Sequence, residues 1–428
     1  MLLTLRNRWR SFTPDVRRHL VNAGVYGMTL DGGITTVIQN LYALRLGFGP
    51  ELIGLINSLG LLVFAVLSLP SGRIGERYGH HRVMRTGAVV IFAGALLVPI
   101  TGLVPENRRA LVLVLSGLLT NIGLAGYYAN AAPYVVAWTG SDHRTSVFST
   151  QSAVFSTFGF AGSLLGGLLP GAIAALLGVT LQVAAPYQIT LMLVPLFALI
   201  PLRMLWLMRE PPVLHEPDPP VRAAAAATGA PAAAALAQMS PLTLIGLFAL
   251  MRFLMVGGVG SATTFFNVYM DNGLGASTAV IGGFQAAAKL LGVPIALAVP
   301  WLTRRFGNAR VVLVTALIVS CSLFPMGLIP VWWVAGLSYM GVWVLTPVRY
   351  AAFMVISMER TPRGSRGTMN GAQEMLGGLS FALVAFVGGR VIASMGYMPL
   401  FVFTAFMSLS GVLLFVWFER RWRRSLAG

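Results

Sequence analysis

Charged residues are scarce in this sequence. Only 10% of its 428 residues are Asp, Glu, Lys or Arg, whereas 56% are hydrophobic. A soluble domain contains about 25% charged residues, so the composition excludes an ordinary soluble globular protein. The net charge of +17 would suit a nucleic-acid surface, but the cations lie in short segments between long apolar runs. We therefore expect a membrane protein with no nucleic-acid partner.

Cysteine, lysine and histidine are also rare. Cys321 is the one cysteine, which excludes an intrachain disulfide, and Lys289 is the one lysine among 30 cationic residues. The five histidines lie outside the apolar runs or at their borders, without the spacing of metal ligands: His19, His80, His81, His143 and His215. No cluster of nucleophiles or paired acids accompanies them. We expect no metal, no cofactor and no enzymatic activity.

Long apolar runs are what the chain has in abundance. A helix needs about 20 mostly apolar residues to span a bilayer. The sequence contains twelve such runs, at 20–45, 51–71, 83–104, 110–138, 146–177, 187–208, 241–270, 278–301, 311–329, 331–358, 367–394 and 399–418. They predict an all-α, multi-pass membrane protein.

The arginines are distributed unequally between the two ends of these runs. Twenty-three fall on the side of the N-terminus, and only four fall on the other side: Arg45, Arg108, Arg109 and Arg390. Positive residues accumulate in cytoplasmic loops. This asymmetry predicts that both termini are cytoplasmic and that the protein lies in the inner (cytoplasmic) membrane.

One long segment, residues 209–240, separates the sixth run from the seventh. It begins with prolines and continues into alanine tracts, a composition typical of a stiff, extended linker. We predict six-helix bundles at 1–208 and 241–428, joined by a cytoplasmic linker. The alternative is a regulatory or partner-binding role for this segment.

The two halves resemble each other. The run Glu76 to Arg82 matches Arg304 to Arg310 at an offset of 228 residues. Further matches at similar offsets are Asn40 with Asn267, Gly54 with Gly282, Asn57 with Gln285, Tyr128 with Tyr350, Arg144 with Arg366, Gln151 with Gln373, and Gly166–Gly167 with Gly388–Gly389. Each match is weak, but their common order predicts two parallel repeats of six helices.

The segment 72–82 is a short basic turn in this scheme, with glycines where the backbone must bend. Its residues Gly72, Glu76, Arg77, Gly79 and Arg82 resemble the loop 2–3 signature of the major facilitator superfamily, with Glu76 in place of the more usual aspartate. The second copy departs further, because Arg304 stands at the acidic position. The resemblance covers essentially the whole chain. It implies two pseudo-symmetric bundles around a central cavity.

The resemblance also implies a role for this signature. In proteins of the superfamily the loop acts as a latch on the cytoplasmic face, and its acid pairs with cations and helix N-termini. Here Glu76, Arg77 and Arg82 would form the latch, with Arg144 and Arg366 as candidate partners. Carboxylates are stabilised at helix N-termini and by arginine. The alternative is that the motif only marks the cytoplasmic side.

Five charges interrupt the apolar runs: Asp31, Arg252, Lys289, Arg349 and Glu374. A charge at the bilayer centre costs roughly 2.5–3.5 kcal/mol, so each should face a cavity or a partner. The resemblance implies that the first, fourth, seventh and tenth helices line the cavity, flanked by the second, fifth, eighth and eleventh. All five charges fall on these helices, which favours a polar central pathway.

Several roles stay open for these charges. Asp31, followed by Gly32-Gly33 where the helix can distort, is a proton or substrate site or else an ion-pair partner of Arg252 or Lys289. Lys289 contacts a substrate anion or pairs with Asp31. For Arg349 and Glu374 we favour a mutual salt bridge, with a coupling role as the alternative.

Uncharged side chains complete the predicted pathway. We expect Asn40, Tyr127 and Tyr128 to line it. Further candidates are Gln39, Asn57, Asn121, Asn130, Gln151, Asn267, Gln285 and Tyr350. A hydrogen bond between helices is the alternative for each.

The function implied is secondary active transport of a small solute by alternating access, coupled to protons. The large apolar and aromatic complement favours efflux of drug-like or metabolic compounds, as by an antiporter. Gly162 to Gly167 resembles the antiporter signature only in part, because Ser163 replaces its proline. Uptake of a small organic anion or zwitterion is the alternative, and lipid translocation is a further one. We expect the protein to act as a monomer.

Overall fold

The computed structural model describes residues 12–30, 32–139, 141–210, 240–361 and 366–427, and every regular element in these ranges is helical. The first half contains α2 (Pro14–Thr29), α3 (Ile34–Arg45), α4 (Pro50–Tyr78), α5 (His80–Ile100), the 3₁₀ turn η1 (Thr101–Leu103), α6 (Glu106–Ala137), α7 (Ser141–Leu177) and α8 (Ala185–Leu207). The second half contains α10 (Pro241–Val268), the π-helical η3 (Tyr269–Gly273), α11 (Thr278–Phe306), α12 (Asn308–Leu328), α13 (Trp332–Glu359), α14 (Arg366–Met395) and α15 (Tyr397–Ala427).

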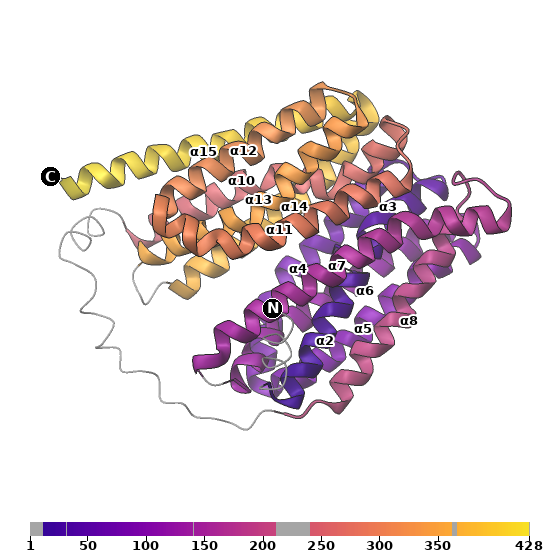
Figure 1. Ribbon diagram of the computed structural model, residues 1–428, viewed down its shortest axis with the longest axis horizontal. Coiled ribbons are helices and arrows are strands. Elements are labelled where there is room, and N and C mark those ends of the chain that lie inside the picture. The colour runs from indigo at the N-terminus through magenta and orange to yellow at the C-terminus, as the bar shows by residue number, and fades with distance from the viewer. Residues whose placement is uncertain (1–11, 31, 140, 211–239, 362–365, 428) are drawn as a thin grey trace.

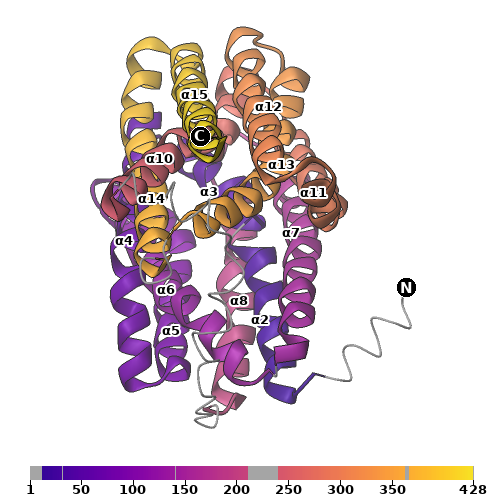
Figure 2. The same cartoon turned by 90° about the vertical axis from the view of Figure 1, so that its left-hand side faces the viewer.

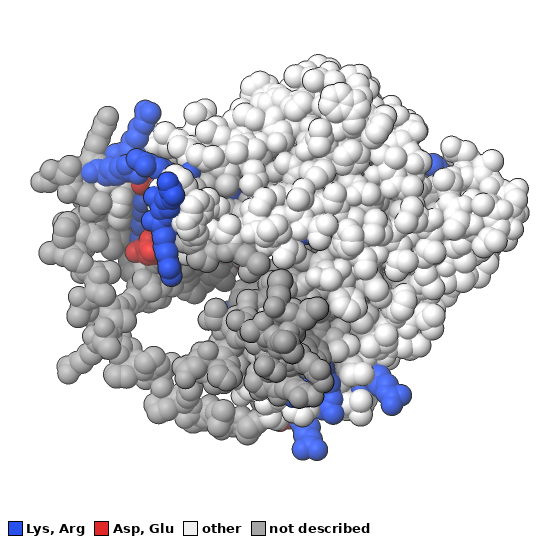
Figure 3. Space-filling model, viewed as in Figure 1, with Lys and Arg blue, Asp and Glu red and all other residues white. Residues whose placement is uncertain are grey.

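Most of these helices have the length and composition of membrane spans. Among the described residues, 11 helices are long and apolar enough to cross a bilayer. The first predicted run corresponds to α2 and α3 together. Basic side chains gather at the end of the molecule that carries the described termini, and most of the visible surface elsewhere is uncharged (Figure 3).

The helices form two bundles, α2–α8 and α10–α15, that diverge like the arms of a V (Figure 1). The bundles meet at the end away from the termini, and they separate toward the end from which α2 starts and α15 finishes. Two helix pairs form most of the contact between them, α4 with α14 and α7 with α11 (Figure 2). We call the two ends the closed end and the open end.

The turn between α4 and α5 is much tighter than predicted. The segment 72–82 was expected to be a loop, but α4 continues to Tyr78 and α5 begins at His80. Only Gly79 leaves the helix, with a φ of 97°, in the region that favours glycine. Gly307, 228 residues later, makes the same turn between α11 and α12 with a φ of 80°. The sequence repeat therefore corresponds to a structural one here.

The distortion predicted at Gly32-Gly33 is a full break between α2 and α3. Gly32 has a φ of 91°, and its amide donates to Thr36 Oγ1 at 2.8 Å. Thr36 Oγ1 in turn donates to the Leu30 carbonyl at 2.9 Å, and Ser163 Oγ of α7 donates to the Gly32 carbonyl at 2.7 Å. These bonds satisfy backbone groups that a continuous helix would pair internally.

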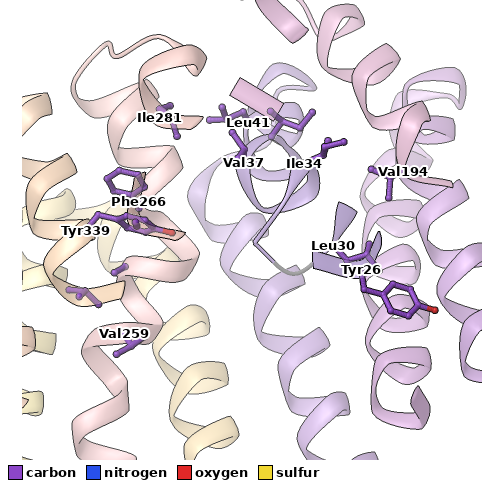
Figure 4. Packing of buried hydrophobic residues seen from close by; sticks show 14 of the residues in the cluster. Tyr26, Leu30, Ile34, Val37, Leu41, Val194, Val259, Phe266, Ile281 and Tyr339 are labelled. Atoms are coloured by element: carbon purple, nitrogen blue, oxygen red, sulfur yellow. The ribbon is translucent and has the colours of Figure 1, made fainter. Parts of the chain in front are cut away.

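The main apolar core continues from one bundle to the other at the closed end. Ile34, Val37 and Leu41 of α3 belong to the same buried cluster as Phe266 of α10 and Ile281 of α11 (Figure 4). The short helix α3 therefore packs against both bundles. A relative movement of the bundles would change the contacts of α3.

Candidate functional site

Two pairs of glycines bring the bundles together at the closed end. A side-chain carbon on Gly54 of α4 would lie 3.1 Å from the Cα atom of Gly389 on α14. A side-chain carbon on Gly282 of α11 would meet the Cα atom of Gly167 on α7 at 2.5 Å. The sequence repeat aligns Gly54 with Gly282 and Gly167 with Gly389. The two contacts are therefore equivalent, with the bundles exchanged.

Amide side chains make a second symmetric contact beside the glycines. Asn40 of α3 donates through Nδ2 to the Thr264 carbonyl of α10 at 2.9 Å. Asn57 of α4 donates to Asn40 Oδ1 at 3.2 Å and holds that side chain in place.

The second bundle repeats this arrangement. Asn267 of α10 donates to the Val37 carbonyl of α3 at 2.8 Å, and Gln285 Nε2 of α11 donates to Asn267 Oδ1. The offset of 227 that relates Asn40 to Asn267 also relates Val37 to Thr264. Each bundle thus donates a hydrogen bond to the equivalent backbone carbonyl of the other bundle. We call Asn40, Asn57, Asn267 and Gln285 the amide clasp.

An ion pair without a counterpart in the repeat completes the closed end. Arg45 of α3 contacts Asp271 of η3 at 2.6 Å, and each side chain is 10% exposed. The Arg45 Nε also donates to the Leu181 carbonyl at 2.7 Å, and the guanidinium lies 5.6 Å from the ring centre of Tyr187. We did not predict this pair, because charges at the ends of apolar runs are ordinary loop features. Only their proximity singles them out.

Toward the open end, three helices of the second bundle bring a charged cluster together. Arg252 of α10 lies 3.8 Å from Glu374 of α14, and Tyr350 of α13 donates to Glu374 Oε1 at 2.9 Å. The Arg252 guanidinium lies 4.5 Å from the centre of the Tyr350 ring.

The position of Glu374 on α14 shows which way it faces. One turn further along α14, a side-chain carbon on Gly378 would lie 2.7 Å from Ala65 Cβ of the first bundle. Residues four apart share a helix face. Glu374, whose side chain is 49% exposed, therefore faces the first bundle at the point where the bundles separate.

The predicted salt bridge between Arg349 and Glu374 is wrong. Arg349 is buried, and its Nη1 donates to the Met255 carbonyl of α10 at 2.8 Å. Successive residues of a helix point about 100° apart, so Tyr350 and Arg349 cannot both face α14. Tyr350 takes the side that faces Glu374, and Arg252 supplies the cation.

Lys289 of α11 reaches across to the helix break of the first bundle. A side-chain carbon on Gly32 would collide with its ammonium group, which also lies 5.1 Å from the Trp343 ring and 5.8 Å from the Phe155 ring. Asp31, the predicted partner of Lys289 or Arg252, lies outside the described residues. Since Arg252 pairs with Glu374, Lys289 is the cation placed beside the glycine that follows Asp31.

A cavity of about 230 Å³ opens beside the break between α2 and α3. Among the described residues that line it, none is charged. Its polar lining consists of amides and hydroxyls from α3, α4, α6 and α10: Thr35, Thr36, Gln39, Asn40, Asn57, Thr120, Asn121, Thr263 and Thr264. Asn40, which we predicted to line the central pathway, is one of the residues that line this cavity. The threonines were missed, because a threonine in an apolar run carries no distinctive signal.

Tyr127 and Tyr128 do not line this cavity. Tyr127 is fully buried inside the first bundle, edge-on to Tyr26 at 4.7 Å between ring centres, with its hydroxyl 3.5 Å from His19 Nδ1. Tyr128 packs edge-on against Tyr127 at 5.5 Å. In this structure both contribute to packing among α2 and α6.

The predicted latch lies at the open end, where the bundles are apart. Glu76 and Arg82 are exposed, and neither makes an ion pair with any described residue. Arg77 is exposed and lies over the neighbouring Tyr78 ring at 5.3 Å. Arg144 lies in the first turn of α7 and Arg366 begins α14, but their side chains lie outside the described residues. Gly72 is part of α4, and Gly79 makes the turn already described.

Known proteins share both the sequence pattern and the fold. The family model of the Major Facilitator Superfamily matches residues 21–385. A crystal structure of a D-xylose-proton symporter superposes with a TM-score of 0.70 at 14% identity, over 94% of this chain and 96% of that one.

Other solved transporters are similar to the same degree. An inward-facing, occupied bacterial homologue of the human lysosomal transporter Spinster has a TM-score of 0.70 at 14% identity, covering 95% of this chain and 97% of that one. An auto-inhibited peptide transporter of the POT family has 0.69 at 15%, covering 96% and 97%. At these identities the likeness shows the fold alone. With the family match over most of its length, the chain belongs to the Major Facilitator Superfamily of membrane transporters.

Proposed function

We propose that this protein moves a small solute across the cytoplasmic membrane by alternating access and couples the movement to protons. The observation that carries the proposal is a carboxylate, Glu374, exposed between the bundles where they separate and paired there with Arg252. A site between two rocking bundles is the geometry that alternating access requires.

The open end would face the cytoplasm in this state. The arginine distribution predicts cytoplasmic termini, and the bundles separate at the end that carries them. The absence of ion pairs around Glu76 among the described residues is what a cytoplasmic latch should show when that side is open. When the bundles close there, Glu76 and Arg82 would find partners at the facing helix ends.

Glu374 is the carboxylate that we propose to exchange protons with the open end. Protonation would remove its charge and release Arg252, whose guanidinium would then lack its anionic partner. Releasing this cation changes the charge between the bundles. A change of charge there shifts their equilibrium only if one state pairs the charge better than the other. Asp31, which precedes Gly32 in the sequence, is the second proton candidate that we carry forward.

The cavity supports a small solute better than a drug-sized one. Its volume of about 230 Å³ is below the roughly 300–1,000 Å³ of drug-sized ligand sites. Efflux of metabolic compounds and uptake of small solutes both remain compatible with this size. The direction of transport and the monomeric state stay predictions.

Proton movement in proteoliposomes tests the proposal. Purified protein is reconstituted with a pH-sensitive dye inside the vesicles, and small solutes are added singly outside. At least one solute should change the internal pH, and an imposed pH gradient should change the flux of that solute. The substitution Glu374→Gln should abolish the proton movement, whereas Glu106→Gln, an exposed carboxylate at the closed end, should not. Solute flux that ignores the gradient, or proton movement that survives Glu374→Gln, would overturn proton coupling at this site.

A further inference from the structure

We infer that the cavity beside the α2–α3 break binds a small uncharged solute that donates hydrogen bonds from hydroxyl or amide groups. The inference rests on the proposed transport function and names the substrate class that the function would serve. The charged residues of the apolar runs do not lead to this inference, because the described residues that line the cavity are neutral and come mostly from the first bundle, with Thr263 and Thr264 added by α10.

The lining argues first against a charged solute. The described lining residues include no Asp, Glu, Lys or Arg, and aliphatic side chains such as Val98, Leu191 and Val194 form its back wall. An ion moved from water into such a site loses hydration, and the described lining offers it no side chain of opposite charge. The charged cluster of Arg252 and Glu374 belongs to the second bundle and lines a different part of the path.

Several polar groups of the cavity lining make no hydrogen bond within the protein, and most of these groups are acceptors. Asn57 and Asn121 use their Nδ2 groups to donate to carbonyls of their own helices at 2.8 and 2.9 Å. Their Oδ1 atoms have no donor among the described residues. Thr35 Oγ1 is buried and likewise lacks a partner among the described residues. Of these atoms only Thr35 Oγ1 is fully buried, whereas the two amide oxygens belong to half-buried residues that line the cavity. A solute bearing O–H or N–H groups would donate to the amide oxygens in place of water.

The size of the cavity limits the solute. The cavity volume of about 230 Å³ is below the roughly 300–1,000 Å³ of drug-sized ligand sites, which favours a solute smaller than a typical drug. Polyols, monosaccharides and small amides have this size and are rich in donors.

The position of the cavity links occupancy to closure. Asn40 and Asn57 line the cavity and also belong to the amide clasp. Their counterparts Asn267 and Gln285 are only 2% and 4% exposed. A solute in the cavity can therefore contact the clasp only through the first bundle. A hydrogen bond to Asn57 Oδ1 would stabilise the side chain that orients Asn40.

Binding to the purified full-length protein in detergent tests the inference. The probes are glucose, glucuronate and glucosamine, which have similar size but differ in charge, together with ribitol, erythritol and acetamide. We expect at least one neutral probe to raise the melting temperature in a dose-dependent way, and its charged counterparts to bind at least tenfold more weakly. Stabilisation by charged probes only, or by no probe, would overturn the inference.

A matched pair of variants locates the site. Asn121 lines the cavity without belonging to the clasp, so Asn121→Ala should weaken binding of the neutral probe about tenfold, the effect of one lost hydrogen bond to a buried group. Asn107→Ala, at an exposed position of the same helix, should leave binding unchanged. Equal effects of the two variants would place the probe elsewhere. Proton-coupled flux of an anion without neutral binding would refute this inference alone, whereas neutral binding without any flux would refute the transport proposal alone.

Discussion

The two halves of the amide clasp make the same hydrogen bonds in different surroundings. Asn40 and Asn57 of the first bundle open onto the cavity, whereas Asn267 and Gln285 of the second are enclosed by protein. The contact that closes the bundles was thus preserved in both repeats, but only one copy is accessible to a solute. We infer that one copy holds the closed end and that the other can also respond to what the cavity contains.

The first helices of the two repeats also differ, and again it is the first bundle whose helix contributes more to the cavity. The first bundle breaks its helix between Thr29 and Ile34, whereas α10 runs without interruption to Val268. The break directs Thr35 and Thr36 to the cavity wall, and α10 offers Thr263 and Thr264 from the opposite side. The asymmetry of the site therefore begins in the backbone.

The largest effect should come from the one closing contact that has no repeat counterpart. Arg45→Ala leaves Asp271 buried without its cation, which should disfavour the closed end by about 3–5 kcal/mol. Spin labels on cysteines at Arg108 and Ser394, two exposed positions at this end, should then report longer distances. The exposed native Cys321 is first replaced by serine. Charge reversal, Arg45→Asp with Asp271→Arg, should restore the short distance, and an unchanged distribution in Arg45→Ala would show that the pair does not hold this end.

Removing one copy of the amide clasp should lower the unfolding free energy by a different amount from removing the other. Asn267→Leu leaves the Gln285 amide without its acceptor and removes the second hydrogen bond of the Val37 carbonyl, both away from water, so we expect a loss of about 2–3 kcal/mol in unfolding free energy. Asn40→Leu exposes the equivalent groups to the cavity, where water can replace the amide, and should cost about 1 kcal/mol. Thermal unfolding of the purified variants gives the comparison. Equal losses would mean that the burial of the second copy has no energetic consequence.

The paired glycine contacts should behave alike, because here the surroundings are equivalent. Gly54→Ala and Gly282→Ala each place a carbon against the backbone of the other bundle, an overlap that typically costs about 1–3 kcal/mol. Gly283→Ala is the matched control, since a carbon there meets nothing within 4 Å. The same label distances should lengthen in the first two variants and stay unchanged in the third. A response to only one of the pair would reveal an asymmetry that the contacts do not show.

Much of the fold was predictable because hydropathy is a property of consecutive residues. The apolar runs matched the helices, and the glycines at 79 and 307 matched the turns between them. The intramembrane charges were conspicuous for the same reason. Their partners were not, because Glu374 pairs with Arg252, which lies more than a hundred residues earlier in the chain. The choice between Arg349 and Tyr350 depends on the rotation of α13, and adjacent residues give no sign of it.

The sequence by itself determined the class of protein, the membrane spans and the duplication of six helices. Each follows from local composition or from the order of matching residues. Only the tertiary structure decided which end is closed, that Arg45 meets Asp271, and that one amide pair of two faces a cavity. These features join helices from different repeats. They depend on the depth and rotation at which each helix packs, and residues distant in the chain set that packing together.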